Sequence, residues 1–223
     1  MINGVRLKVC GITSLVDAEA ADAVGADYLG FIFYPPSPRG ITATQYAAMK
    51  DRLPPRKRVA VMVEPSAADL AALARQDFDR FQIHFNADTP VHTIAAWSHL
   101  AGKAQLWLAP RLPPGQDVKA EWLPLAETFL LDTFHADKFG GTGATGDWEK
   151  FKRHQAAHGT KTWILSGGLK PDNIAAAVTA TGAKFVDVNS GVEQAPGVKS
   201  PEKLKALVLA LHNATKQDNP AYR

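Results

Sequence analysis

The sequence has only one cysteine, Cys10, among its 223 residues. A single thiol cannot form a disulfide within the chain, so a disulfide framework is excluded, as is a structural zinc site that needs two or more cysteines. No hydrophobic run approaches the roughly 18–20 residues of a transmembrane helix. The N-terminal residues lack the apolar core of a signal peptide. These absences predict a soluble protein of the cytoplasm with no membrane partner.

The sequence also has little excess charge of either sign. Its 25 lysines and arginines against 22 aspartates and glutamates give a net charge of +3. The densest basic cluster, residues 56–58, leads directly into an apolar run, which is typical of a solvated strand entrance. A nucleic-acid interface needs a broader basic stripe with interleaved aromatic residues. We therefore predict no nucleic-acid partner.

Eight short apolar runs alternate with segments of helical period along the chain. The runs span residues 5–9, 27–33, 58–63, 80–84, 104–109, 128–132, 162–166 and 184–188. The helical segments span residues 15–24, with Ser14 as the cap, and 42–52, 67–75, 90–100, 147–158, 172–181 and 201–213. The proline-rich segment 111–126, between the fifth and sixth runs, gives the weakest helical pattern.

This alternation predicts the architecture. Apolar runs without polar alternation suit strands that are buried on both faces, as in parallel sheets. Eight strand–helix units in this chain have roughly 28 residues each, which is close to the number of residues per unit in a (β/α)8 TIM barrel. A doubly wound open sheet shares the alternation but rarely needs eight strands in so short a chain. We predict a single α/β domain, a (β/α)8 barrel over residues 1–213, followed by a frayed polar tail, residues 214–223.

Glycine-rich segments follow the seventh and eighth predicted strands. In a barrel of this kind the chemistry lies at the carboxyl ends of the strands, and phosphate often binds after strands seven and eight. Glycines let backbone N–H groups approach an anion, and a following helix N-terminus adds positive charge. Gly167 and Gly168, with Ser190 and Gly191, are therefore candidate phosphate-binding residues. The alternative is that these glycines only form tight turns.

Other strand ends carry single reactive side chains. Cys10 is either a small buried hydrophobic residue or a base, the latter if neighbouring charges lower its thiol pKa. Arg39, in a loop with three prolines, suits a bidentate grip on a carboxylate or phosphate, unless it is a surface residue. Asp132 is either a loop anchor or a catalytic acid. His84 is a substrate-binding candidate, and a structural role is equally open.

These residues belong to a set of motifs that resembles one family. The motifs are KVCGIT (8–13), GFIF (30–33), SPR (37–39), LLD (130–132), GGTG (140–143), SGGL (166–169) and VDVNSGVE (186–193). In this order, and at the expected strand ends, they resemble phosphoribosylanthranilate isomerase, a (β/α)8 barrel of tryptophan biosynthesis. The resemblance implies an Amadori rearrangement of N-(5-phosphoribosyl)anthranilate to 1-(2-carboxyphenylamino)-1-deoxyribulose 5-phosphate.

The resemblance also implies roles for the candidates. Asp132 is the general acid, Cys10 the general base, and Arg39 the residue that binds the anthranilate carboxylate. Asp187 contacts the sugar hydroxyls or orients its loop, and the glycine segments bind the phosphate. No metal, nucleotide or organic cofactor and no obligate protein partner is implied.

Two rival functions remain open from the sequence. Another phosphate-binding barrel, such as indole-glycerol-phosphate synthase or a histidine-pathway isomerase, needs a catalytic lysine or a second aspartate at other strand ends. Lys8 lies on the first predicted strand, but no second strand-end lysine is found where the synthase chemistry needs one. A non-catalytic phosphosugar-binding barrel is the other rival, and it would tolerate the loss of Cys10.

Overall fold

Eight parallel strands close into a barrel in the computed structural model, which describes residues 1–132 and 147–217. Each strand pairs with the next along the chain, and β8 pairs with β1, so the ring has no edge. The strands are β1 (Arg6–Val9), β2 (Tyr28–Ile32), β3 (Lys57–Val63), β4 (Arg80–Asn86), β5 (Leu106–Arg111), β6 (Thr128–Leu131), β7 (Thr162–Leu165) and β8 (Phe185–Val188). The predicted (β/α)8 barrel is confirmed, and its closure excludes the open sheet.

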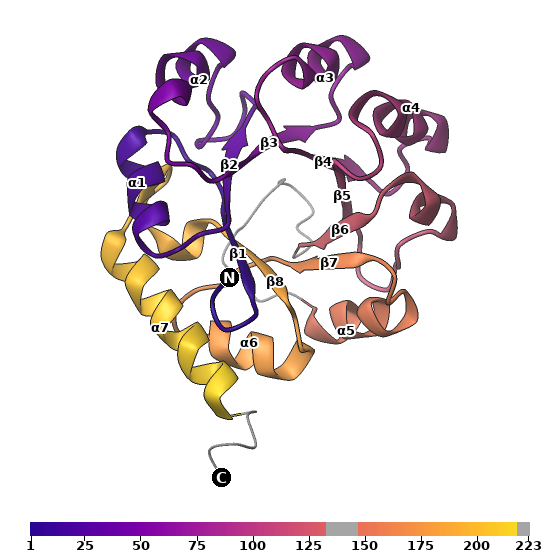
Figure 1. Ribbon diagram of the computed structural model, residues 1–223. Helices are drawn as coiled ribbons and strands as arrows, with labels where there is room; N and C mark the ends of the chain where they lie inside the picture. Colours follow the sequence, from indigo (N-terminus) through magenta and orange to yellow (C-terminus); the bar gives the residue numbers. More distant parts are fainter. Residues whose placement is uncertain (133–146, 218–223) are drawn as a thin grey trace.

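The helices surround this ring (Figure 1). They are α1 (Leu15–Ala23), α2 (Ala43–Met49), α3 (Ala67–Ala74), α4 (Val91–Ala101), α5 (Trp148–Ala157), α6 (Ile174–Thr181) and α7 (Pro201–Gln217), with the short 3-10 helices η1 (Lys50–Arg52), η2 (Ala120–Leu125) and η3 (Ser190–Val192). All seven predicted helical segments are confirmed. Ser14 caps α1 as predicted, because its hydroxyl accepts a hydrogen bond from the Asp17 N–H.

The connection between β5 and β6 contains η2 instead of an α-helix. Pro124 lies inside this segment, and a proline cannot donate the backbone hydrogen bond that an α-helix requires. Trp122 of η2 is fully buried, with its ring centroid 5.2 Å from that of Phe85. One large aromatic side chain therefore covers this part of the barrel.

The last helix is longer than predicted. It continues to Gln217, four residues beyond the predicted end at residue 213. Ala214 is 6% exposed and extends the buried spacing of Leu204, Leu207 and Leu211, so its apolar face continues past the predicted boundary. Residues 218–223 of the predicted tail lie outside the described residues. In the part of the chain that is described, no helix is both long and apolar enough to cross a bilayer.

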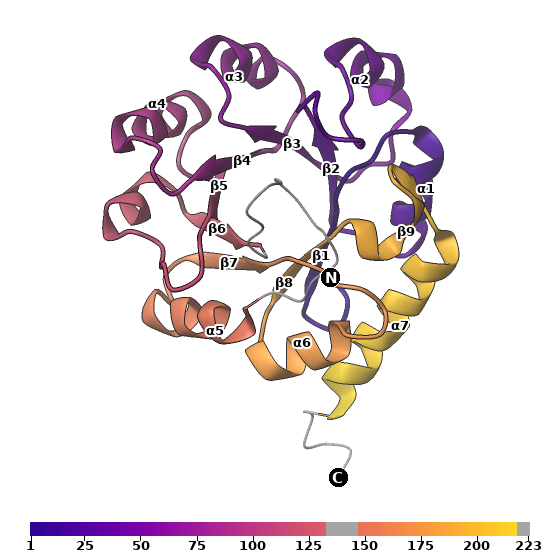
Figure 2. The ribbon, with the colours of Figure 1, turned by 180° about the vertical axis from the view of Figure 1, so that it is seen from behind.

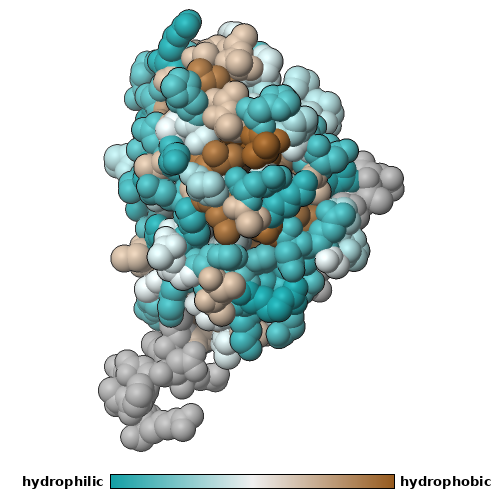
Figure 3. Space-filling view, turned by 90° about the vertical axis from the view of Figure 1, so that its right-hand side faces the viewer, coloured by the Kyte–Doolittle hydropathy of each residue, from teal (hydrophilic) through white to brown (hydrophobic). Residues whose placement is uncertain are grey.

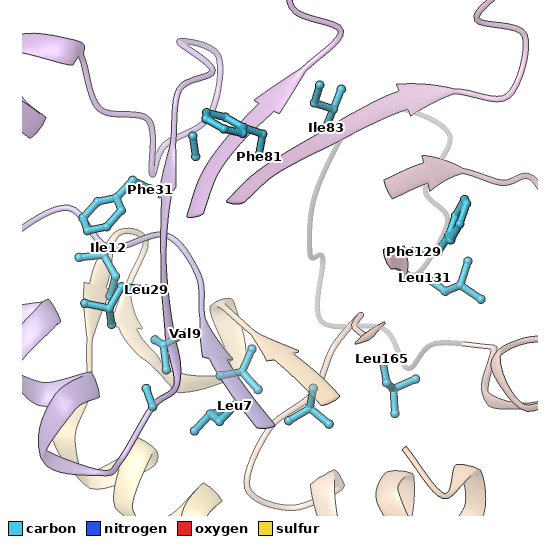
Figure 4. Packing of buried hydrophobic residues seen from close by; sticks show 14 of the residues in the cluster. Leu7, Val9, Ile12, Leu29, Phe31, Phe81, Ile83, Phe129, Leu131 and Leu165 are labelled. Atoms are coloured by element: carbon cyan, nitrogen blue, oxygen red, sulfur yellow. The ribbon is translucent and has the colours of Figure 1, made fainter. Parts of the chain in front are cut away.

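Side chains of the strands alternate between two apolar layers. Leu7, Val9, Leu29 and Phe31 belong to the larger cluster, which also contains residues of the helices and fills the space between strands and helices (Figure 4). The smaller cluster lies inside the barrel and consists, apart from Cys10, of strand residues. It comprises Cys10, Tyr28, Val59, Val61, Trp107, Ala109, Leu130, Ile164 and Phe185. Because the period of a strand is two, every second residue faces the interior.

A short hairpin lies outside the ring of eight strands. A two-stranded antiparallel hairpin, β9 (Glu193–Ala195) and β10 (Val198–Lys199), follows β8. Figure 2 shows β9 beside α1 and the start of α7.

The side of the molecule shown in Figure 3 is mostly hydrophilic around a hydrophobic area near its middle.

The outer apolar layer should dominate the stability of the barrel. Phe31 is fully buried, with its ring centroid 5.1 Å from that of Tyr46 in α2. We expect Phe31→Ala to lower the free energy of unfolding by about 3–5 kcal/mol, because it leaves a cavity between β2 and α2. Val16→Ala, at a side chain that is 72% exposed, should change it by less than about 0.5 kcal/mol. Urea unfolding measures both, and similar values for the two variants would contradict this packing.

Candidate active site

An open cavity lies at the carboxyl ends of the strands. Its lining combines interior-facing strand residues with the loops that follow β1, β2, β6, β7 and β8. All nine site residues predicted from the sequence line it: Cys10, Arg39, His84, Asp132, Gly167, Gly168, Asp187, Ser190 and Gly191. The GGTG motif at 140–143 lies outside the described residues. The structure thus brings together, in one cavity, residues that are far apart in the sequence.

A buried ion pair forms the floor of this region. Lys8 Nζ donates hydrogen bonds to both carboxylate oxygens of Asp187, at 3.0 and 2.9 Å, and the two side chains are 0% and 6% exposed. Burial lowers the pKa of Lys8, but Asp187 and Cys10 outweigh it, so the pKa lies above its ordinary value. Burial raises the pKa of Asp187, and Lys8 opposes that shift. The carboxylate of Asp187 binds Lys8 and also lines the cavity, and its expected contact with the sugar hydroxyls or role in orienting its loop stays a prediction.

Cys10 is 4% exposed at the end of β1, and its N–H donates to the carbonyl of Val188. Burial raises the pKa of the Cys10 thiol above its ordinary value, and the nearby Lys8 ammonium lowers it. The expected lowering by a neighbouring charge is therefore present, but burial is the larger effect. Cys10 is mainly a thiol at neutral pH.

His84 and Gln82 form a pair on the interior face of β4. Their side-chain nitrogens, Nε2 of each, lie 2.7 Å apart. Burial, with a further contribution from Lys8, lowers the pKa of His84 to about 4, so the imidazole is neutral at pH 7. Gln82 is buried, lines the cavity, and its Oε1 has no hydrogen-bond partner within the described residues. This pair offers neutral polar groups to a ligand.

Arg39 is held in place by a buried carboxylate, Glu193, which it shares with Lys199. Its Nε and Nη2 donate to Glu193, at 2.9 and 2.8 Å, and Lys199 Nζ donates to the same carboxylate at 2.9 Å. The Arg39 side chain is 15% exposed, so it is not an ordinary surface arginine. Burial raises the pKa of Glu193, but the bonds from Arg39 and Lys199 hold it below its ordinary value. Two cations share one carboxylate here, which leaves a net positive charge beside the cavity.

The loops after β7 and β8 approach each other so closely that one position requires glycine. A Cβ on Gly191 would lie 2.0 Å from the carbonyl oxygen of Leu169. Gly167 and Gly168 have positive φ angles of 93° and 59°, which disfavour other residues. The second cluster, Ser190 and Gly191, lies within the short η3, which was not predicted, and five residues, 169–173, separate the first cluster from α6.

Sequence reasoning missed four polar residues of this region: Lys8, Gln82, Glu193 and Lys199. Two of them had a usable signal, because Lys8 and Gln82 lie two residues before Cys10 and His84 and so share their strand faces. Glu193 closes a motif but pairs with Arg39, 154 residues away. For Lys199 the sequence carries no such signal. Within residues 1–132 and 147–217, no group of three or more His, Cys, Asp or Glu side chains could hold a metal ion.

Comparison with known proteins agrees with this geometry. The family described as N-(5'phosphoribosyl)anthranilate (PRA) isomerase matches residues 7–210. The chain belongs to this family. An isomerase of that name from Magnetococcus marinus is 40% identical over 214 residues, which cover 94% of this chain and 96% of the relative.

Solved structures of PRA isomerases share the fold. The phosphoribosyl anthranilate isomerase of Thermus thermophilus superposes with a TM-score of 0.76 at 31% identity, over 94% of this chain and 99% of that one. Another member, solved in complex with reduced 1-(o-carboxyphenylamino)-1-deoxyribulose 5-phosphate, gives a TM-score of 0.72 at 29% identity, with the same coverage.

The charge network behind Arg39 leads to a pH-dependent stability. We expect Glu193→Gln to lower the free energy of unfolding by about 2–3 kcal/mol at pH 7, because Arg39 and Lys199 lose their charged acceptor. The folded-state pKa of Glu193 is lowered, so this contribution is complete above the unfolded value of about 4.3 and disappears as the pH falls through the folded value. Urea unfolding from pH 7 to pH 3 should show the two proteins converging only below about pH 4.5.

The exposed Glu19 provides the matched control. Glu19→Gln should follow the parent protein across the whole pH range. A Glu193→Gln variant as stable as the parent at pH 7 would contradict the role of this carboxylate.

Proposed function

We propose that this protein catalyses the isomerisation of N-(5-phosphoribosyl)anthranilate to 1-(2-carboxyphenylamino)-1-deoxyribulose 5-phosphate in tryptophan biosynthesis. The observation that carries the proposal is the single cavity that Cys10, Asp132, Arg39 and the two glycine loops line together. Membership of the PRA isomerase family supports it. The substrate has a carboxylate on its aromatic ring and a phosphate on its sugar, and the cavity offers a binding group for each.

The reaction needs no external oxidant or reductant. Carbon 1 of the sugar is reduced from the aldehyde level to an amine-bearing CH2 group, while carbon 2 is oxidised from an alcohol to a ketone. The two changes balance within one molecule. One acid and one base suffice, so we infer that the enzyme works without a cofactor, as an intramolecular oxidoreductase.

Asp132 acts first. It is the first residue after β6, and its side chain lines the cavity. Protonation of the furanose ring oxygen by Asp132 lets the bond between that oxygen and carbon 1 break. The nitrogen lone pair forms the double bond of the resulting Schiff base.

Cys10 acts second. As a thiolate it removes the proton from carbon 2, and the electron pair moves toward the Schiff base to give an enolamine. The enolamine then gains a proton at carbon 1 and loses the proton of its carbon 2 hydroxyl, which gives the ketone. The Cys10 sulfur lies in a different wall of the cavity from Asp132, since β1 and β6 are not neighbours in the barrel.

Two anion sites orient the substrate. Arg39, fixed by Glu193, binds the anthranilate carboxylate, which suits a guanidinium group. Backbone N–H groups of the loops at 167–168 and 190–191 bind the phosphate, as is common after the last two strands of such barrels. The neutral His84 and Gln82 are available to the sugar hydroxyls.

The rival synthase function finds no support in the interior of the barrel. Lys8 is the strand lysine that it would use, and it is fully buried with both hydrogen bonds made to Asp187. Such a lysine has no access to a substrate in the cavity mouth.

We expect Cys10→Ala and Asp132→Asn each to lower kcat/KM by about 10²–10⁴, the usual contribution of a positioned acid or base. Product formation from N-(5-phosphoribosyl)anthranilate, followed by chromatography, measures the loss. Both variants should still bind the product, because the two anion sites are unchanged. A variant that retains more than about a tenth of the parent kcat/KM, a difference below about 1.4 kcal/mol, removes the residue from its role.

A further inference from the structure

The immediate surroundings of Cys10 contain a lysine that the mechanism above does not use. Lys8 precedes Cys10 by two residues on β1, so both side chains face the barrel interior. The ammonium of Lys8 donates two hydrogen bonds to Asp187, and its positive charge lowers the pKa of the nearby Cys10 thiol. Because Lys8 is 0% exposed, its ammonium group needs partners within the protein to offset the loss of water. The site supplies a carboxylate on one side and the sulfur on another.

Gly30 makes room for this arrangement. It lies on β2, whose residues Tyr28 and Leu29 pair with Lys8 and Val9 of β1. A Cβ on Gly30 would lie 2.9 Å from Lys8 Cε, 3.0 Å from Cys10 Sγ and 3.1 Å from Lys8 Nζ. The end of the lysine and the sulfur thus converge over the one position of β2 that has no side chain. A side chain at this position would displace the end of Lys8 or the sulfur of Cys10.

We propose that Lys8 is a positioning residue that stabilises the thiolate of Cys10, and that Asp187 and Gly30 hold its ammonium group beside the sulfur. The inference rests on the proposed role of Cys10 as the base. It gives the Lys8–Asp187 pair a function in the reaction beyond its place in the core.

The two partners of the pair act on the thiol in opposite directions. The positive charge of Lys8 favours the thiolate, whereas the negative charge of Asp187 disfavours it. The Lys8–Asp187 ion pair, which has no net charge, therefore favours the thiolate less than Lys8 would alone. Asp187 keeps a buried ammonium charged and in place, and it weakens the attraction of that ammonium for the sulfur.

Other charges near Cys10 belong to different elements. Lys199, from β10, also favours the thiolate, as the smallest of the contributions to the Cys10 pKa. The remaining ionisable side chains that line the cavity with Cys10 are Tyr34, Arg39, His84 and Asp132. Arg39 and Lys199 are bound to Glu193, and His84 is neutral at pH 7. Lys8 is thus the cation with the largest effect on the sulfur.

The single cysteine of the chain makes the test direct. Alkylation by iodoacetamide, followed by intact mass spectrometry between pH 6 and pH 11, measures the ionisation of Cys10 without any turnover. We expect Lys8→Met to move the midpoint upward by at least about one pH unit, so that alkylation at pH 8 slows about tenfold. Asp187→Asn should move the midpoint downward, because the ammonium then pairs with the thiolate alone.

A third variant and a control complete the design. Gly30→Ala keeps both charges but separates Lys8 from Cys10, so its midpoint should rise as in Lys8→Met. Lys150→Met removes another lysine that is only 8% exposed, in α5, and should leave the midpoint unchanged. The base limb of the kcat/KM–pH profile should move in the same direction as the alkylation midpoint in each variant.

Opposite shifts for Lys8→Met and Asp187→Asn support the proposal. Shifts in the same direction, as the mere loss of a structural ion pair would give, overturn it, and so does an unchanged midpoint in Lys8→Met. If Lys8→Met does not fold, the direction found for Asp187→Asn and Gly30→Ala decides. Opposite alkylation shifts in a protein without isomerase activity would refute the proposed function alone, whereas active variants with parental midpoints would refute this inference alone.

Discussion

The closure of eight parallel strands into one ring is the constraint on which the rest of the structure depends. In a closed sheet every second side chain of every strand must point into a small shared interior. Most of this interior is apolar, from Tyr28 and Phe185 to Trp107. The polar residues on the same faces therefore gather near the carboxyl ends of the strands, where the cavity opens.

Charge pairing follows from that crowding. A buried ion without a partner costs several kcal/mol, and the buried charges beside the cavity have partners of opposite sign: Lys8 pairs with Asp187, and Arg39 and Lys199 share Glu193. In both groups the charges that stabilise the interior lie next to a group with a proposed role in catalysis. The first pair faces the sulfur of Cys10, and the second group fixes the guanidinium of Arg39. Stability and function thus depend on the same buried hydrogen bonds.

Local patterns were enough to predict most of the fold. Apolar runs gave the strands, because a strand buried on both faces has no polar alternation, and Ser14 marked the start of α1 through its capping hydroxyl. The pattern was weak between β5 and β6, where Pro124 prevents an α-helix. The end of α7 was placed too early because polar residues conceal the buried face that Ala214 continues.

The sequence predicted which candidate site residues line the cavity, but it did not predict the buried residues that hold them in place. Strand-end position predicted the places of Cys10 and Asp132, and the rigid proline-containing loop after the second strand predicted that of Arg39. The pairing of Lys8 with Asp187 depends on the register between the first and last strands, 179 residues apart, and no local pattern contains that register. For the same reason the sequence did not predict that Asp187 binds a lysine.

A crystal structure with the reduced product analogue would show directly how the substrate is oriented in the cavity. We expect the phosphate within about 2.7–3.2 Å of backbone nitrogens in the loops at 167–168 and 190–191, with the aromatic carboxylate bound to Arg39. A ligand bound in the reverse orientation, or bound elsewhere with the cavity empty, would contradict it.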